Sequence, residues 1–129
     1  MIAGSFKDAI RCKVLLVEDD ENTCSLYASA LRLDGFYVRT ALDGLAALRV
    51  LESFHPDVVI LDLKLPIASG FEVLSELRSM QFTKPVIAVS GHEQGLEQAR
   101  SNPEFFAALR KPFDPNDLIG VTRRALHAH

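Results

Sequence analysis

The stretch "DVVILDLKLP" at residues 57–66 decides the fold of this chain. Its apolar run at 58–61 has no polar alternation, which is typical of a parallel strand covered on both faces. The run ends in the carboxylate of Asp62, and Pro66 closes the segment. Because a carboxylate is an unusual end for a buried strand, the role of Asp62 depends on which charged residues the fold brings to it.

Similar runs at 14–17 and 85–89 predict two more strands, and weaker signals predict strands at 37–40 and 107–110. Segments with helical period lie between them, and each apolar stripe is predicted to pack on the sheet. The stripes are Cys24, Tyr27, Ala28 and Leu31; then Leu45, Leu48 and Leu51; then Phe71, Leu74 and Leu77. This alternation predicts an α/β fold of the (βα)5 type, with an open, doubly wound parallel sheet and right-handed crossovers.

Turn and cap residues agree with these boundaries. Gly35 stands just past a predicted helix end, and Asp43 is placed to cap the next helix. Near the C-terminus Asp114 is a predicted N-cap, with Pro115 at the first helical position. The last helix is therefore expected to run from about Pro115 towards His127.

The chain has 129 residues, of which 48% are hydrophobic and 24% charged, so we expect one domain over 1–129 with its core at about 13–126. Residues 1–11 are interpreted as a short lead-in. A net charge of −3 argues against a surface that coats nucleic acid. No secretory leader or membrane-length apolar run is present, which predicts a cytoplasmic protein. The two cysteines, Cys12 and Cys24, make no disulfide framework.

Polar residues follow four of the predicted strands. In open parallel sheets ligands bind beyond the carboxyl ends of the strands, so these residues are the candidates for a site. The first and third strands are expected neighbours, which brings the acids that follow them together. The candidates are Glu18 and Asp19 after the first run, Asp62 after the third strand, Ser90 after the fourth and Lys111 after the fifth.

The chemistry of this set favours phosphoryl transfer. Three neighbouring carboxylates repel one another unless a cation joins them, and Mg²⁺ fits best because it takes one or two carboxylates and leaves room for water and phosphate. A metal, a central Asp, a hydroxyl and a lysine allow Asp62 to attack phosphorus while cations neutralise the phosphoryl oxygens. Any one of these residues alone is more often a cap or a solvated charge; their joint occurrence at four strand ends favours a site.

The motifs "VLLVEDD", "VVILDLKLPIASG", "VIAVSG" and "LRKPF" resemble, in order and spacing, the receiver domain of two-component response regulators. The resemblance covers about residues 13–126. It implies a flavodoxin-like three-layer sandwich with strand order 2-1-3-4-5.

The resemblance also implies a role for each candidate residue. Asp62 corresponds to the phosphoacceptor, Glu18 and Asp19 to the acidic pair that holds Mg²⁺, and the main-chain carbonyl of Lys64 to a further metal ligand. Ser90 corresponds to the hydroxyl residue that turns towards the phosphoryl group, and Lys111 to the lysine that pairs with it. The bond from Lys111 to Pro112 corresponds to one that is cis in the family.

Function and partners follow from the same resemblance. The domain is expected to take a phosphoryl group from a histidine kinase or histidine phosphotransfer protein, docking near the site and the first helix, and to switch conformation. It would catalyse only its own phosphorylation and dephosphorylation, with an output partner or domain outside this chain. The face of the fourth helix, the strand at 107–110 and the last helix is the expected output or homodimer surface. No direct contact with nucleic acid or membrane is expected.

Two positions depart from the family pattern or vary within it. An aromatic residue usually stands three positions before the lysine, where this chain has Ala108; Phe105 and Phe106 are the nearest aromatics. We hypothesise that the phosphorylation chemistry survives and that coupling through an aromatic rotamer does not. Lys64, at a variable position beside the pocket, is either a solvated lysine or one that restrains the water attacking the phosphoryl group.

Three other functions agree with part of this pattern. A hydrolase of the haloacid-dehalogenase type needs a second acid two residues after the nucleophile, where Lys64 stands. A flavodoxin-like cofactor binder is disfavoured because the acidic turn "EDDENT" at 18–23 would repel a phosphate, and no glycine-rich dinucleotide or P-loop motif occurs. A pseudo-receiver, which binds partners without phosphorylation, stays open and is disfavoured by the complete set of site residues.

Overall fold

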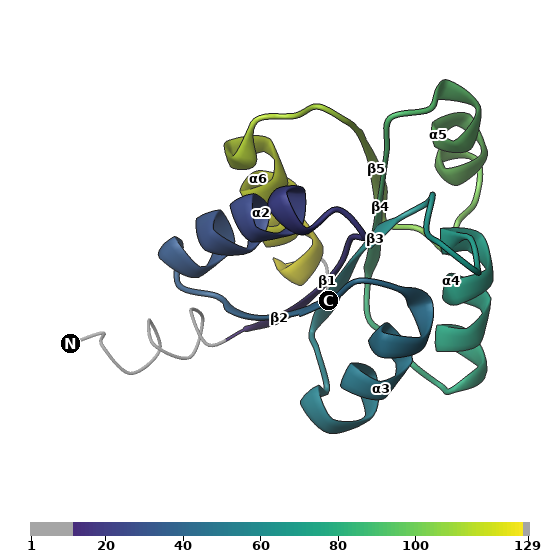
Figure 1. The fold of residues 1–129 in the computed structure, drawn as a ribbon, viewed down its shortest axis with the longest axis horizontal. Coiled ribbons are helices and arrows are strands. Elements are labelled where there is room, and N and C mark those ends of the chain that lie inside the picture. Colours follow the sequence, from purple (N-terminus) through teal and green to yellow (C-terminus); the bar gives the residue numbers. More distant parts are fainter. Residues whose placement is uncertain (1–11, 128–129) are drawn as a thin grey trace.

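A computed structural model describes residues 12–127, which places the predicted lead-in at 1–11 outside the described residues. Strands and helices alternate along the chain (Figure 1). The strands are β1 (Lys13–Val17), β2 (Tyr37–Ala41), β3 (Val58–Asp62), β4 (Val86–Ser90) and β5 (Ala107–Arg110). The helices are α2 (Glu21–Leu33), α3 (Gly44–Phe54), α4 (Gly70–Ser79), α5 (Glu93–Arg100) and α6 (Pro115–His127).

The strands form one parallel sheet in the order β2-β1-β3-β4-β5, which confirms the predicted topology. β3 lies in the middle, with Leu61 opposite Val17 of β1 and Asp62 opposite Val89 of β4. All residues of β3 are buried, as the unbroken apolar run predicts. The carboxyl ends of β1, β3 and β4 therefore meet at one edge of the sheet.

Helices cover both faces of the sheet, so the fold has three layers. α2 and α6 lie on one face, and α3, α4 and α5 lie on the other (Figure 1). Successive residues of the central strands alternate between the two cores: Leu16 and Ile60 pack with α2 and α6, whereas Leu15 and Val59 pack with the other three helices. No helix in residues 12–127 is long and apolar enough to cross a membrane.

The predicted stripe of α2 is confirmed, because Cys24, Tyr27, Ala28 and Leu31 are all buried. Cys24 and the half-buried Cys12 are both free thiols.

The prediction that Leu45 packs on the sheet is wrong, because its side chain is 60% exposed. α3 buries Gly44, Ala47 and Leu51 instead. The reason is a close approach between helices: a Cβ placed on Gly44 would lie 2.7 Å from Cγ2 of Val73 in α4. This approach sets the rotation of α3 and turns Leu45 outward.

The predicted cap and turn residues are confirmed at three helix ends. Asp43 accepts a hydrogen bond from the amide of Ala46 at the start of α3, and Gly35 has a φ of 103° just after α2. The side chain of Asp114 accepts from the amide of Asn116 at the start of α6. Asp43 and Asp114 lie in the loops that follow β2 and β5, at the edge where the polar residues lie, whereas Gly35 precedes β2 at the opposite edge.

Gly70, the first residue of α4, allows the loop after β3 to fold back on the strand end. Its amide donates to the carbonyl of Leu63 at 2.9 Å. A Cβ at this position would lie 2.5 Å from the carbonyl oxygen of Asp62 and 2.7 Å from Cα of Leu63. Only a residue without a side chain fits against the main chain here, and the position of Asp62 depends on it.

We predict that Gly70→Ala lowers the free energy of unfolding by about 1–3 kcal/mol, because the added methyl group must displace main-chain atoms. Urea denaturation measures the change. Gly120→Ala in α6 is the matched control: its Cβ would lie 3.8 Å from the flexible end of Arg124, and it should gain about 0.5–1 kcal/mol from helix propensity. Equal stability of Gly70→Ala and the native chain would contradict the close packing at this loop.

Candidate functional site

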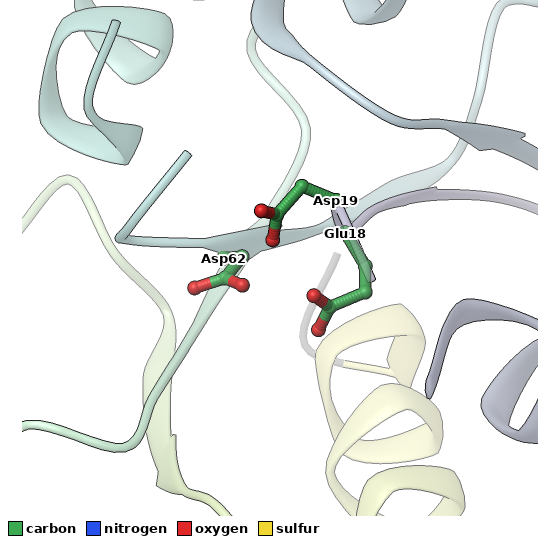
Figure 2. A group of neighbouring side chains, drawn as sticks. All are labelled: Glu18, Asp19 and Asp62. Carbon is green, nitrogen blue, oxygen red and sulfur yellow. The ribbon is translucent and has the colours of Figure 1, made fainter. Parts of the chain in front are cut away.

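The candidate side chains gather at the carboxyl ends of the strands. Glu18 and Asp19 directly follow β1, Asp62 and Ser90 are the last residues of β3 and β4, and Lys111 follows β5. Figure 2 shows Glu18 and Asp19 beside Asp62, with the three side chains at the ends of neighbouring strands. The predicted juxtaposition of these acids is therefore present in the structure.

The ammonium group of Lys111 joins two of the acids. Its Nζ lies 2.5 Å from Oε1 of Glu18 and 2.8 Å from Oδ2 of Asp62. Both carboxylates are almost fully buried, with 2% of Glu18 and 4% of Asp62 exposed. The amide of Lys111 donates to the carbonyl of Ser90, and the peptide bond from Lys111 to Pro112 is cis, as the resemblance implied.

Main-chain amides bind the remaining carboxylate oxygens. The amide of Lys64 donates to Oδ1 of Asp62 at 3.0 Å, and the amide of Asp20 donates to Oε2 of Glu18 at 3.1 Å. Asp20 itself caps α2, where its side chain accepts from Thr23. Each oxygen of the two buried acids thus has a donor, which accounts for their burial.

Burial and charge shift the pKa values of this cluster. Burial raises the pKa of Glu18, and the nearby charge of Asp62 adds to the rise, whereas hydrogen bonds from Lys111 and from the Asp20 amide oppose it. Burial alone would lower the pKa of Lys111, but hydrogen bonds and charges from Asp62 and Glu18 outweigh it and raise that pKa. The site therefore favours the charged form of Lys111, and the ionised form of Glu18 depends on the Lys111 ammonium group.

Three carboxylates offer oxygen atoms that suit a hard cation. One oxygen each of Glu18, Asp19 and Asp62 lies within 4.8 Å of the others. Asp19 is exposed, so this group opens to solvent on one side. A small number of carboxylates beside open space fits Mg²⁺, which keeps several water ligands. The residues present therefore fit the predicted metal.

Ser90 lies beside this cluster without contacting it. Its hydroxyl is buried, accepts from the amide of His92 at 3.0 Å and donates to the His92 carbonyl at 3.5 Å. A Cβ on Gly95 would lie 3.6 Å from its Oγ, so the start of α5 packs in ordinary contact with the serine. The structure thus brings Ser90 to the correct strand end, with its hydroxyl bound to the following loop.

The aromatic residues near Ala108 occupy different environments. Ala108 is half-buried in the core beneath α3, α4 and α5. Phe105 is buried there, with its ring edge-to-face to that of Phe71 at a centroid distance of 5.7 Å. Phe106 is 38% exposed. Phe105 is therefore a core residue, and Phe106 has a surface position.

Reasoning from the sequence missed two features of the site. It did not foresee that Lys111 bonds to Glu18 in the resting site, with Asp62 as its second partner, or that the amide of Asp20 holds Glu18. The contact between Asp20 and Glu18 joins residues two positions apart, so the run "EDD" at 18–20 was the available signal. The contact between Lys111 and Glu18 joins residues 93 positions apart, so it can be recognised only once the arrangement of the strands is known.

We predict that Lys111→Met lowers the free energy of unfolding at pH 7 by about 1–3 kcal/mol, because two buried carboxylates lose a charged donor. Without the ammonium group, the folded-state pKa of Glu18 rises further above its ordinary value of 4.5. A raised carboxyl pKa costs stability as the pH rises through the folded-state pKa, so the deficit should shrink on acidification.

Urea denaturation of the native chain and Lys111→Met at pH 7 and pH 5 measures this effect, with the exposed Lys84→Met as control. A deficit that is equal at both pH values would contradict the role of the ammonium group.

Comparison with known families matches residues 14–123 to the response regulator receiver domain. The chain is 40% identical over 120 residues to the transcriptional regulatory protein PrrA of Mycobacterium leprae (strain TN), which covers 88% of this chain and 49% of that protein. It is 33% identical over 117 residues to the regulatory protein AtoC of Escherichia coli (strain K12), covering 88% of this chain and 25% of that protein. The chain thus spans half or less of these relatives.

Solved structures share the fold over nearly their whole length. The chemotaxis response regulator CheY4 of Vibrio cholerae is 28% identical, with a TM-score of 0.81 over 90% of this chain and 99% of that one. The response regulator TrrA of Thermotoga maritima is 27% identical, with a TM-score of 0.77 over 89% of this chain and 99% of that one. With its matched strands, helices and motifs, this chain belongs to the response regulator receiver domain family of two-component systems.

Proposed function

We propose that this domain accepts a phosphoryl group on Asp62 in a reaction that requires Mg²⁺, and that the change in charge switches its conformation. The observation that carries the proposal is the environment of Asp62. One carboxylate oxygen contacts the Lys111 ammonium and the other contacts the Lys64 amide, while Glu18 and Asp19 lie alongside. A buried, oriented carboxylate between a fixed cation and a group of metal ligands is equipped to attack phosphorus.

In the proposed reaction a carboxylate oxygen of Asp62 forms a bond to phosphorus as the bond to the donor's leaving group breaks. Lys111 would leave Glu18 and pair with a phosphoryl oxygen, because the new anion carries more charge than the carboxylate it replaces. The hydroxyl of Ser90 would leave the His92 amide and donate to a second phosphoryl oxygen. That movement would shift the loop between β4 and α5, and so provide a two-state switch.

Glu18 and Asp19 would hold Mg²⁺ together with Asp62 and the main-chain carbonyl of Lys64. When bound, the cation supplies positive charge opposite the phosphoryl oxygens. The proposal is supported by the three converging carboxylates and by the relative TrrA, whose solved structure is described as a complex with Mg²⁺ and BeF. Before phosphoryl transfer, ionised Glu18 would have both Mg²⁺ and Lys111 as cationic neighbours, which fits a carboxyl group whose burial raises its pKa.

Partners follow from family membership. We propose a histidine kinase or histidine phosphotransfer protein as donor, docking at the site edge beside α2, in a cytoplasmic setting. Relatives named as transcriptional regulatory proteins are about twice as long as the matched region, since it covers 49% of PrrA. We therefore propose that output comes from another domain or protein, through the face of α5, β5 and α6, which is also the proposed homodimer surface.

Two other functions are less well supported. A pseudo-receiver would need no intact acceptor site, yet the described residues hold Asp62, Lys111, Ser90 and the acidic pair at the appropriate strand ends. A phosphate-ester hydrolase would need an acid where Lys64 stands. We propose that the only reactions catalysed are the domain's own phosphorylation and dephosphorylation.

The proposed function is tested by intact-protein mass after incubation with acetyl phosphate, with and without Mg²⁺. We predict one added phosphoryl group that requires Mg²⁺ and is absent in Asp62→Asn. Asp19→Asn should raise the Mg²⁺ concentration that is needed, because an exposed ligand is lost. Asp20→Asn is the matched control, since asparagine caps a helix as well as aspartate does.

No added mass with the fold intact would contradict the proposal and favour the pseudo-receiver. An equal Mg²⁺ requirement for Asp19→Asn and Asp20→Asn would contradict the assignment of the metal ligands alone.

We predict that Lys64→Ala changes the dephosphorylation rate of the domain several-fold, because the exposed Lys64 side chain belongs to the residues that line the pocket beside Asp62. Loss of phosphoryl mass over time, after removal of acetyl phosphate, gives the rate. Lys84→Ala removes an exposed lysine remote from the pocket and serves as control. Equal rates for the native chain and Lys64→Ala would show that Lys64 is only a solvated surface residue.

A further inference from the structure

Figure 1 shows α3 and α4 on the face of the sheet opposite α2 and α6. Residues of these two helices and of the loop after β3 line a groove. Its volume is about 470 Å³. Leu45 and Leu48 of α3 line one side, Val73 of α4 lines the other, and Pro66 and Ile67 form the wall at the loop after β3. The groove is separate from the surfaces proposed above for the phosphoryl donor and for output.

Large apolar side chains are exposed at this groove, and no element within residues 12–127 covers them. Leu45 is 60% exposed, and Ile67 is 98% exposed. Ile67 also has a φ of 74°, a conformation that is rare for a β-branched residue because of steric crowding. The sequence therefore places a strained and fully exposed isoleucine where glycine or asparagine would be the favourable choice, which points to a use for its side chain.

Acidic side chains mark the edges of the same groove. Asp43 lies at one end, and Glu72 and Glu76 lie about one helical turn apart on α4. In residues 12–127 none of these three carboxylates is part of an ion pair. Among the residues that the structure describes, no lysine or arginine lines the groove. The surface thus combines an apolar floor with unopposed negative charge.

We propose that this groove binds a helix of a partner protein that presents large apolar side chains flanked by lysine or arginine. Both long walls are helices, so an amphipathic helix can lie between them as in other helix-in-groove complexes. Asp43, Glu72 and Glu76 have no ion-pair partner among the described residues, so their negative charge favours a basic partner and disfavours an anionic one. Pro66 lines both this groove and the acidic pocket, so the bound helix would lie against the loop that carries Lys64.

A second copy of this chain suits the groove less well. A two-fold contact through this surface would place Asp43, Glu72 and Glu76 of one copy against the same acids of the other. Like charges in a contact of this kind disfavour association. The net charge of −3 of the whole chain adds to this repulsion.

The test uses the ¹⁵N-labelled chain and two fluorescein-labelled peptides of 15 leucine and lysine residues. One peptide has a helical apolar stripe and the other has the same composition in scrambled order. Amide shifts locate binding, and anisotropy measures affinity at low and high salt. We expect shifts confined to α3, α4 and residues 63–69, and at least about tenfold weaker binding of the scrambled peptide, because burial of the apolar stripe is lost.

Two variants and a control test which groove residues contribute to peptide binding. Ile67→Gly removes the exposed side chain and suits the positive φ, so the fold is retained; it should weaken binding about tenfold. Glu76→Gln should weaken binding about twofold and reduce its salt dependence. Leu33→Ser, at a leucine that is 90% exposed at the end of α2, is the matched control and should bind as the native chain does.

Several outcomes would overturn the proposal. These are shifts spread over α2 and β2, equal affinity for the two peptides, or equal affinity of Ile67→Gly and Leu33→Ser. Self-association of the native chain that Ile67→Gly abolishes would assign the groove to a second copy in place of a basic helix.

Discussion

The contact of the Lys111 ammonium with two buried carboxylates is the interaction on which the site depends. Nζ lies within 2.8 Å of both Glu18, which follows β1, and Asp62, the last residue of the neighbouring strand β3. Neither acid is stable in a buried position without a charged donor, and the lysine has no other acidic partner among the described residues. The same lysine that offsets part of the negative charge of the resting site is the residue that an incoming phosphoryl group would recruit. The interaction that offsets the cost of burying the two acids is thus the one that the proposed phosphorylation would change.

The fold places the acceptor on a rigid strand and places its partners where strands meet loops. Asp62 belongs to a strand buried on both faces, and Gly70 holds the following loop against its carbonyl. Ser90 and Lys111 stand where strands change into loops, so a small loop movement changes their partners while the acceptor stays in place. The loop after β3 also links the acidic pocket to the groove between α3 and α4, since Pro66 lines both.

Much of this arrangement was predictable from the sequence, because unbroken apolar runs define buried parallel strands and the residue after each run falls at one edge. The strand order came from the resemblance, since the runs alone do not set which strands pair. Leu45 was misplaced because helical period does not show which residues face a neighbouring helix, and the contact of Gly44 with Val73 determined that rotation. The partners of Ser90 and the bond from Lys111 to Glu18 depend on side-chain conformations that no local pattern encodes.

A crystal structure of the domain grown with Mg²⁺ and beryllofluoride, a phosphoryl analogue, tests the central claim most directly. We predict beryllofluoride on Asp62, Mg²⁺ on Glu18 and Asp19, and Lys111 moved from Glu18 to a fluorine. We also predict that the hydroxyl of Ser90 leaves the His92 amide for the analogue while Phe106 keeps its rotamer. A complex in which Lys111 stays on Glu18, or in which the analogue does not bind Asp62, would contradict the account.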